Sequence, residues 1–259
     1  MKKILTLFTF SLLATIAFAQ KLEVKYQEIV KVNPEEFKGT VKFSTNGKES
    51  QIPNDVYDNM IKNMQEPKDF LLTINDNESF YNKVEKIDNQ QGRNGMKVSV
   101  SFGDSGNGLF KNLTTKEYLK NVKSFQKDYT IKDKLTEYKW QLSRETKKII
   151  GFDVKKATAI IDSIQTTAWY IPTLKYKTGP ENYWGLPGLI AEVETEINRG
   201  PISGKRIISL TNISTATNTK SIEKPKDKNA ISQKEYNKLM NDQRKRFEEM
   251  RNSGVNKRD

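Results

Sequence analysis

The sequence predicts a mainly β protein of the α+β class: a curved antiparallel β-meander or half-barrel with a few short helices and a C-terminal helix. Apolar and polar residues alternate with a period of two along much of the chain, which is typical of half-buried strands. No strong amphipathic helices separate these segments, as they would in a parallel βαβ fold. The chain has 259 residues, enough for one hydrophobic core and a tail. We therefore expect one β domain over residues 20–213.

Residues 1–19 have the pattern of a cleavable secretory signal peptide. Lys2 and Lys3 precede an apolar stretch over residues 4–16, and an A-x-A cleavage site ends at Ala19. A membrane anchor is the weaker alternative, because the apolar stretch is too short to span a bilayer. The chain has no cysteine, so it cannot carry a lipid on a cysteine after cleavage. We expect a periplasmic or secreted protein that is not a lipoprotein and has no transmembrane segment after cleavage.

The first half of the domain begins with an alternating strand. Leu22, Val24 and Tyr26 point to one side of it, with charged residues between them. A short helix over residues 54–64 ends before Pro67. The apolar segments that follow are expected to pair as hairpins, 70–74 with 79–84 and 97–102 with 109–113.

Further strands are expected in the second half, at residues 138–142, 148–154, 157–161, 166–171, 189–197 and 205–213. The alternation is clearest in 189–197, where Glu192, Glu194 and Glu196 face away from the apolar positions. This spacing indicates a solvated strand face rather than a cluster of catalytic carboxylates.

Residues 214–229 are predicted to form a linker, and residues 230–259 a charged C-terminal helix and tail. Ser232 and Glu235 have the spacing of a capping box. A hydrophobic staple and a narrow apolar stripe are expected at Ile231, Tyr236, Leu239, Met240, Phe247 and Met250. Docking of this helix on its own domain is the simpler interpretation, and binding of a partner is the alternative.

The amino-acid inventory excludes several classes of enzyme. Histidine and cysteine are both absent, which excludes Ser-His-Asp and Cys-His nucleophiles and the usual zinc and haem ligands. The segment 103–108 is similar to the serine loop of trypsin-like proteases, but no histidine can accept the serine proton. No phosphate-binding loop or dinucleotide fingerprint follows a strand. We predict no catalytic residue, metal or cofactor, and a carboxylate-dependent hydrolase remains the alternative.

The formal net charge of +12 raises the question of an anionic partner. Residues 220–259 hold twelve lysines and arginines against seven acidic residues. Elsewhere the lysines are scattered among acidic residues, and no nucleic-acid-binding motif accompanies them. A solvated surface is therefore expected, with no nucleic-acid partner.

Aromatic residues are concentrated in one part of the chain. Trp140, Trp169 and Trp184 all lie within residues 138–184. Large aromatic side chains usually fill the core of a β protein, but a curved sheet can also leave a ligand-sized apolar groove. If there is such a groove, the residues expected to line or border it are Trp169, Tyr170, Tyr183, Trp184 and Leu186.

A predicted tight turn lies beside these aromatic residues. Pro187 has its φ fixed near −65°, and glycine accepts a positive φ without steric cost. The spacing therefore predicts a type II turn over residues 186–189, with Gly188 at positive φ. Gly185, Pro187 and Gly188 are expected to be structural residues.

The run Gly185 to Ile190 is one of several short motifs that together resemble a known family. The other motifs are Ala168-Trp169-Tyr170, Gly179-Pro180, Trp140-x-Leu142, Glu145-x-Lys147 and Ile150-Gly151-Phe152. This combination closely resembles the GLPGLI family of secreted proteins, found mostly in Bacteroidota, over nearly all of residues 20–213. Val154 stands where that family usually has a cysteine, and Lys175 where it tends to have a proline. The resemblance implies an exported β domain but no activity. A weaker likeness of fold is to periplasmic lipoprotein carriers, which hold acyl chains in an apolar concavity.

These observations favour a non-enzymatic exported protein of the cell envelope that binds an apolar ligand or an envelope protein partner. The alternatives are a carboxylate-dependent hydrolase and a structural subunit of an outer-membrane assembly.

Overall fold

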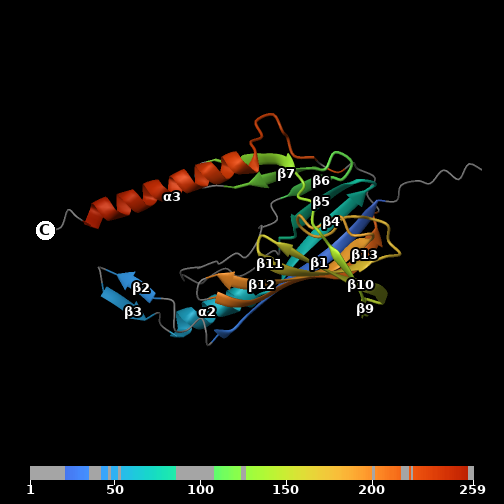
Figure 1. Ribbon diagram of the computed structural model, residues 1–259. Coiled ribbons are helices and arrows are strands. Elements are labelled where there is room, and N and C mark those ends of the chain that lie inside the picture. Colours follow the sequence, from blue (N-terminus) through green and yellow to red (C-terminus); the bar gives the residue numbers. More distant parts are fainter. Residues whose placement is uncertain are drawn as a thin grey trace, which may run out of the picture.

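The structure is a computed structural model, which describes residues 21–34, 42–45, 48–51, 54–85, 108–123, 127–199, 202–216, 222 and 224–255. The predicted signal peptide 1–19, the predicted strand 97–102 and parts of the predicted linker and tail lie outside the described residues. Within the described ranges the chain forms a curved, unclosed antiparallel sheet of eleven strands, a separate two-stranded pair and two helices (Figure 1). The predicted fold class is confirmed.

The large sheet consists of two meanders that meet at the first strand. Its order is β8-β7-β6-β5-β4-β1-β13-β12-β11-β10-β9, so β1 (Leu22–Val32) pairs with β4 on one side and with β13 on the other. The first meander contains β4 (Lys68–Asn75), β5 (Glu78–Lys83), β6 (Leu109–Asn112), β7 (Glu117–Val122) and β8 (Tyr129–Lys134). The second contains β9 (Gln141–Ile149), β10 (Phe152–Ile161), β11 (Ile164–Ile171), β12 (Leu189–Arg199) and β13 (Ile202–Thr215). The two-stranded pair is β2 (Lys42–Thr45) with β3 (Lys48–Gln51).

Several predicted strands differ from the observed ones. The predicted strand 148–154 is wrong, because the chain turns there: Ile150 and Gly151 have φ angles of 42° and 87° and join β9 to β10. The predicted strand 138–142 begins only at Gln141 and continues to Ile149. Strands β7 and β8 were not predicted, because their many charged residues obscure the apolar alternation.

The inner face of the sheet is the one that carries Val24, Tyr26 and Val30 of β1, all nearly inaccessible to solvent. The alternation of β1 places these residues on one side. The main core lies against this face, where the rings of Phe70 and Tyr81 stack with centroids 5.1 Å apart. Helix α2 (Asn54–Gln65) covers one end of the inner face through Tyr57, Ile61 and Met64, which pack on Val30, Val32 and Ile197.

Helix α3 (Gln233–Val255) is the predicted C-terminal helix, and it begins with the predicted capping box. The backbone N–H of Glu235 donates to Ser232 Oγ (3.2 Å), and that of Ser232 donates to Glu235 Oε2 (2.8 Å). Neither α2 nor α3 has the length and apolar character needed to cross a membrane.

Candidate functional site

Residues 172–188, here called the strap, connect β11 to β12 and cross the inner face of the sheet. The strap folds back on itself as a narrow hairpin, since Gly185 N–H donates to Lys177 O (3.0 Å) and Thr178 pairs with Trp184. At its base, Leu189 N–H donates to Leu174 O (2.9 Å) and Ile190 N–H to Thr178 O (3.0 Å). These bonds give the strap a fixed backbone, although it contains no long strand.

The Gly-Leu-Pro-Gly run forms a different turn from the predicted one. Gly188 N–H donates to Leu186 O at 2.8 Å, which is the three-residue pattern of a γ-turn centred on Pro187. The predicted positive φ at Gly188 is wrong, and the residue of the run with positive φ is Gly185, at 92°. Gly188 is required for another reason, because a Cβ at this position would lie 2.2 Å from the carbonyl oxygen of Ile171.

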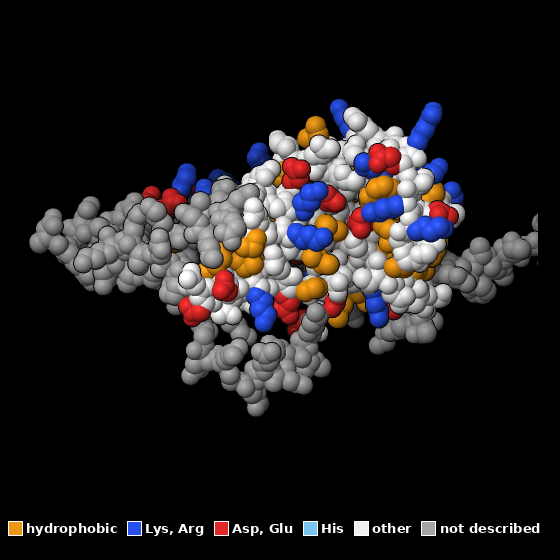
Figure 2. Space-filling model, turned by 90° about the horizontal axis from the view of Figure 1, so that it is seen from below, with side chains coloured by type: hydrophobic (Ala, Val, Ile, Leu, Met, Phe, Trp, Pro, Cys, Tyr) orange, Lys and Arg blue, Asp and Glu red, His pale blue; other side chains and the backbone are white. Residues whose placement is uncertain are grey.

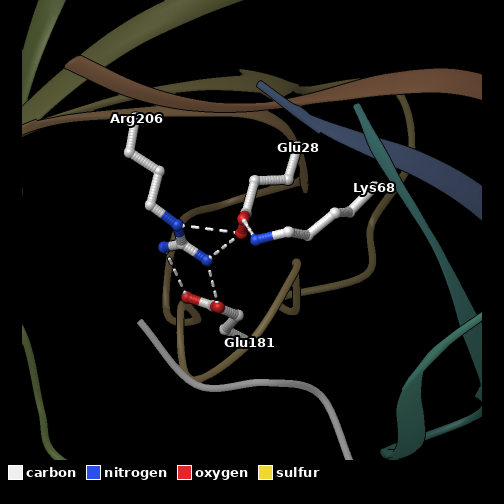
Figure 3. Close-up of polar contacts among 4 residues, drawn as sticks. All are labelled: Glu28, Lys68, Glu181 and Arg206. Carbon is white, nitrogen blue, oxygen red and sulfur yellow. Dashed lines mark hydrogen bonds and ion pairs between the residues drawn. The ribbon is translucent and has the colours of Figure 1, made fainter. Parts of the chain in front are cut away.

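A buried ionic cluster joins the tip of the strap to the sheet (Figure 3). Arg206 of β13 donates from Nε and Nη2 to Glu28 Oε2 of β1, at 2.9 and 2.5 Å. Its Nη1 donates to Glu181 Oε2 of the strap at 2.9 Å, and its Nη2 donates to Glu181 Oε1. Lys68 of β4 approaches Glu28 Oε1 at the edge of the cluster, at 3.4 Å. Arg206, Glu28 and Glu181 are at most 7% exposed, so these pairs are shielded from water and from screening by salt.

Charge balance explains why this cluster tolerates burial. Burial by itself opposes the charge of the Arg206 guanidinium, but the carboxylates of Glu181 and Glu28 outweigh it and raise the pKa of Arg206 above its usual value. Each carboxylate in turn accepts two hydrogen bonds from the guanidinium. A shared guanidinium holds both carboxylates as ion-pair partners, which does not suit a general acid and base. The geometry is that of a latch between the strap and two central strands.

Lys111 of β6 forms a second latch on the other side of the strap. Its side chain is fully buried, and Nζ donates to the carbonyl oxygens of Gly179 and Glu181, each at 2.7 Å, with that of Tyr183 at 3.5 Å. Burial lowers the pKa of Lys111 to about 7, although the negative charge of Glu181 opposes this shift. Nearby, the hydroxyls of Ser79 and Thr178 share a hydrogen bond of 3.2 Å. The strap is therefore tied to both meanders.

The low pKa of Lys111 predicts a pH dependence of stability. The folded protein loses this proton near pH 7, whereas the unfolded chain keeps it to about pH 10.5. The unfolded state therefore binds more protons in this window, and the free energy of unfolding should rise by about 2 kcal/mol between about pH 7 and pH 9. Urea melts across this range should show the rise in the wild type and in Lys83→Met, an exposed control on β5, but not in Lys111→Met. If the free energy of unfolding rose equally with pH in all three proteins, the rise could not be assigned to the lowered pKa of Lys111.

The structure does not bring the five predicted site residues together around one groove. Tyr170 and Leu186 are 4% and 1% exposed and belong to one small apolar core, against which Tyr183 packs. Burial raises the pKa of Tyr183. Trp169 is half-buried on β11, with Lys147 Nζ 4.3 Å from its ring centroid. Trp184 Nε1 donates to Thr136 O at 2.7 Å, in the segment that joins β8 to β9.

Trp184 also lines a cleft of about 360 Å³ between the strap and two hairpin turns. The cleft combines three lysines, one aspartate, two aromatic rings and several small polar groups. From the turns come Asp76, Asn77, Leu113, Thr114 and Lys116, and from the strap Lys175, Tyr176, Lys177, Thr178 and Trp184. Its volume falls within the range of small-molecule sites. Beyond the cleft, basic side chains on the face seen from below are interspersed with acidic ones (Figure 2).

The sequence did not point to the residues of the two latches. Glu28 and Arg206 are 178 positions apart, so no local motif contains both. One signal was present, since Glu28 occupies an inward position of β1 between Tyr26 and Val30. A charged residue in an apolar row indicates a buried partner.

Comparisons with known proteins add a family match over the strap. Residues 160–192 match a family described as a protein of unknown function (Porph_ging). The match contains all of β11, the strap, the end of β10 and the start of β12, and it does not confirm the GLPGLI name. A search of curated proteins gave no match.

Similar solved structures include PNGF-II in two crystal forms, both with a TM-score of 0.44. Their identities to this chain are 18% and 19%, and the matches cover 83% and 81% of it. The chain spans about 30% of the length of these PNGF-II chains. Similarity at this level supports no conclusion about function.

Proposed function

We propose that this protein is an exported, non-enzymatic binding protein of the cell envelope, and that the cleft beside Trp184 binds a small anionic molecule. The observation that supports this proposal is the set of three lysines around the cleft, Lys116, Lys175 and Lys177, against the single carboxylate of Asp76. Export rests on the signal-peptide pattern of residues 1–19.

The cleft offers two kinds of contact to one ligand. Ammonium groups form charge-assisted hydrogen bonds with carboxylate, sulfate or phosphate oxygens. The rings of Tyr176 and Trp184 provide apolar surface for the body of the same molecule. Lys116 forms an exposed ion pair with Glu137 at 2.5 Å, and such pairs are weak enough to be exchanged for a ligand anion. The ligand best suited to the cleft is a small anion with a planar or apolar ring.

The geometry gives less support to an apolar ligand on the inner face. Tyr170 and Leu186, two of the residues expected around an apolar groove, are buried against protein atoms. The strap crosses this face and is held by the latches at Arg206 and Lys111. An acyl chain could enter only if these buried contacts were broken, which would be costly.

Two fluorescent probes distinguish these functions. Anilinonaphthalene sulfonate carries an anionic group on an aromatic body, and N-phenylnaphthylamine has a similar body without the charge. The exported protein is expected to bind the sulfonate, and Lys175→Gln/Lys177→Gln should weaken this binding by about tenfold. The matched control is Lys25→Gln/Lys31→Gln, which removes the same charge from two exposed residues of β1.

The control variant should bind like the wild type. Tight binding of N-phenylnaphthylamine that is unchanged in Lys175→Gln/Lys177→Gln would instead indicate an apolar groove and contradict the proposed anion site. Equal binding of the sulfonate by both double variants would also contradict it.

A further inference from the structure

Helix α3 is attached to the sheet through its first turn. Gln233 N–H donates to Asp133 Oδ2 (3.0 Å), and Tyr118 Oη donates to Gln233 Oε1 (3.2 Å). The rings of Tyr236 and Tyr129 meet edge to face with centroids 5.6 Å apart. From there the helix extends away from the sheet (Figure 1). Most of its length is therefore held at a distance from the core.

Large apolar side chains are exposed on this projecting part. Leu239 is 40% exposed and Phe247 is 64% exposed. Each residue turns the helix by about 100°, so Met240 and Phe247 lie on nearly the same side as Tyr236, with Leu239 at the margin of this stripe. Exposed apolar residues are ordinary when they are scattered. Here they are aligned along one side of a helix whose other residues are mostly charged.

The charges around the stripe have a distinct arrangement. By the same helical geometry, the exposed residues Arg244 and Arg246 border it on its two sides, whereas Asp242, Glu248 and Glu249 lie farther round the helix. The segment 220–259 that contains the helix holds twelve basic residues against seven acidic ones. The stripe is thus an apolar surface with a positively charged margin.

We propose that α3 lies on the surface of a bilayer that contains anionic lipids, with the stripe of Leu239 and Phe247 in the headgroup region. An interfacial helix buries its apolar side at the boundary between headgroups and acyl chains, and basic residues beside it contact lipid phosphates. Arg244 and Arg246 are placed for these contacts, since guanidinium groups bind phosphate oxygens well. Tyr236, at the start of this side, packs on Tyr129 of β8, so the contact with lipid is limited to the part of α3 that projects beyond the sheet (Figure 1). This inference is independent of the ligand cleft.

Vesicle flotation tests the proposal with protein purified from a host that exports it. The wild type should float with phosphatidylcholine vesicles that include phosphatidylglycerol and stay in solution with pure phosphatidylcholine. Phe247→Gln should weaken binding by about tenfold or more, because it removes the largest apolar side chain of the stripe. Arg244→Gln/Arg246→Gln should weaken it and reduce its salt dependence. Asn241→Gln, an exposed change on the polar side of α3, is the matched control and should bind like the wild type.

Three outcomes would overturn this inference. The wild type could fail to float with anionic vesicles at low salt, or Phe247→Gln could bind them as well as the wild type does. Light scattering could also show a dimer that only the stripe variants dissociate, with vesicle binding unchanged. That result would assign the stripe to a second copy of the chain. Circular dichroism of each variant checks that α3 is still formed.

Discussion

Replacement of Arg206 by methionine is expected to lower the free energy of unfolding by about 3–5 kcal/mol. The methionine fills a similar space, but it leaves the carboxylates of Glu28 and Glu181 buried without a cation between them. Urea denaturation at neutral pH measures this loss. If this loss comes from the unpaired carboxylates, adding Glu28→Gln and Glu181→Gln to the Arg206→Met protein should restore a large part of the lost stability.

Lys205→Met is the matched control for this prediction. Lys205 is the neighbour of Arg206 on β13 and forms an ion pair of 2.6 Å with Glu194, but it is 54% exposed. Because water and salt screen exposed pairs, its replacement should change stability far less. Similar losses for both substitutions would show that the Arg206 cluster is not a buried latch.

Gly188→Ala is expected to destabilise the protein by about 3 kcal/mol, through overpacking of backbone against backbone. The added Cβ would lie 2.2 Å from the oxygen and 2.8 Å from the carbon of the Ile171 carbonyl, and neither atom can move without shifting β11. Valine at this position should be worse. Thermal or urea melts of the purified variants measure the effect.

Gly151→Ala separates steric overlap from backbone strain. Gly151 has a φ of 87°, but an added Cβ there would meet no atom within 4 Å. The expected cost is therefore that of strain alone, about 1 kcal/mol. A Gly188→Ala protein as stable as the wild type, or no less stable than Gly151→Ala, would contradict the close approach of the strap to β11.

Much of the fold could be predicted because it depends on local patterns. The alternation in β1 and β12, the hairpin turn near Asp76 and the capping box at Ser232 are all visible within a few residues. The order of the strands could not be predicted in this way. Strand β1 joins the two meanders by pairing with β13, which follows it by about 180 residues, and long-range pairing of this kind is decided by tertiary packing.

The candidate site was harder to predict than the fold. The aromatic run lies partly in the segment that forms the strap, and Trp184 lines a cleft, but the run cannot show that Tyr170 and Leu186 turn into the core. Glu181 carries no signal of its role, because a glutamate in a loop is usually exposed. Its burial follows from the latch to Arg206. Gly188 was predicted to be required because of a positive φ in a turn. It is required instead because an added Cβ would overlap the carbonyl oxygen of Ile171, at the end of β11.

The strap is a fixed part of the core, held across the inner face of the sheet by the two latches. Hydrogen exchange of the purified protein tests this at the backbone amides of Gly185, Leu189 and Ile190, which donate to the carbonyl oxygens of Lys177, Leu174 and Thr178. These amides should exchange as slowly as those of the central strand β1, through global unfolding. Exchange at the rate of an open loop, while β1 stays protected, would contradict the claim and return the inner face to consideration as a ligand groove.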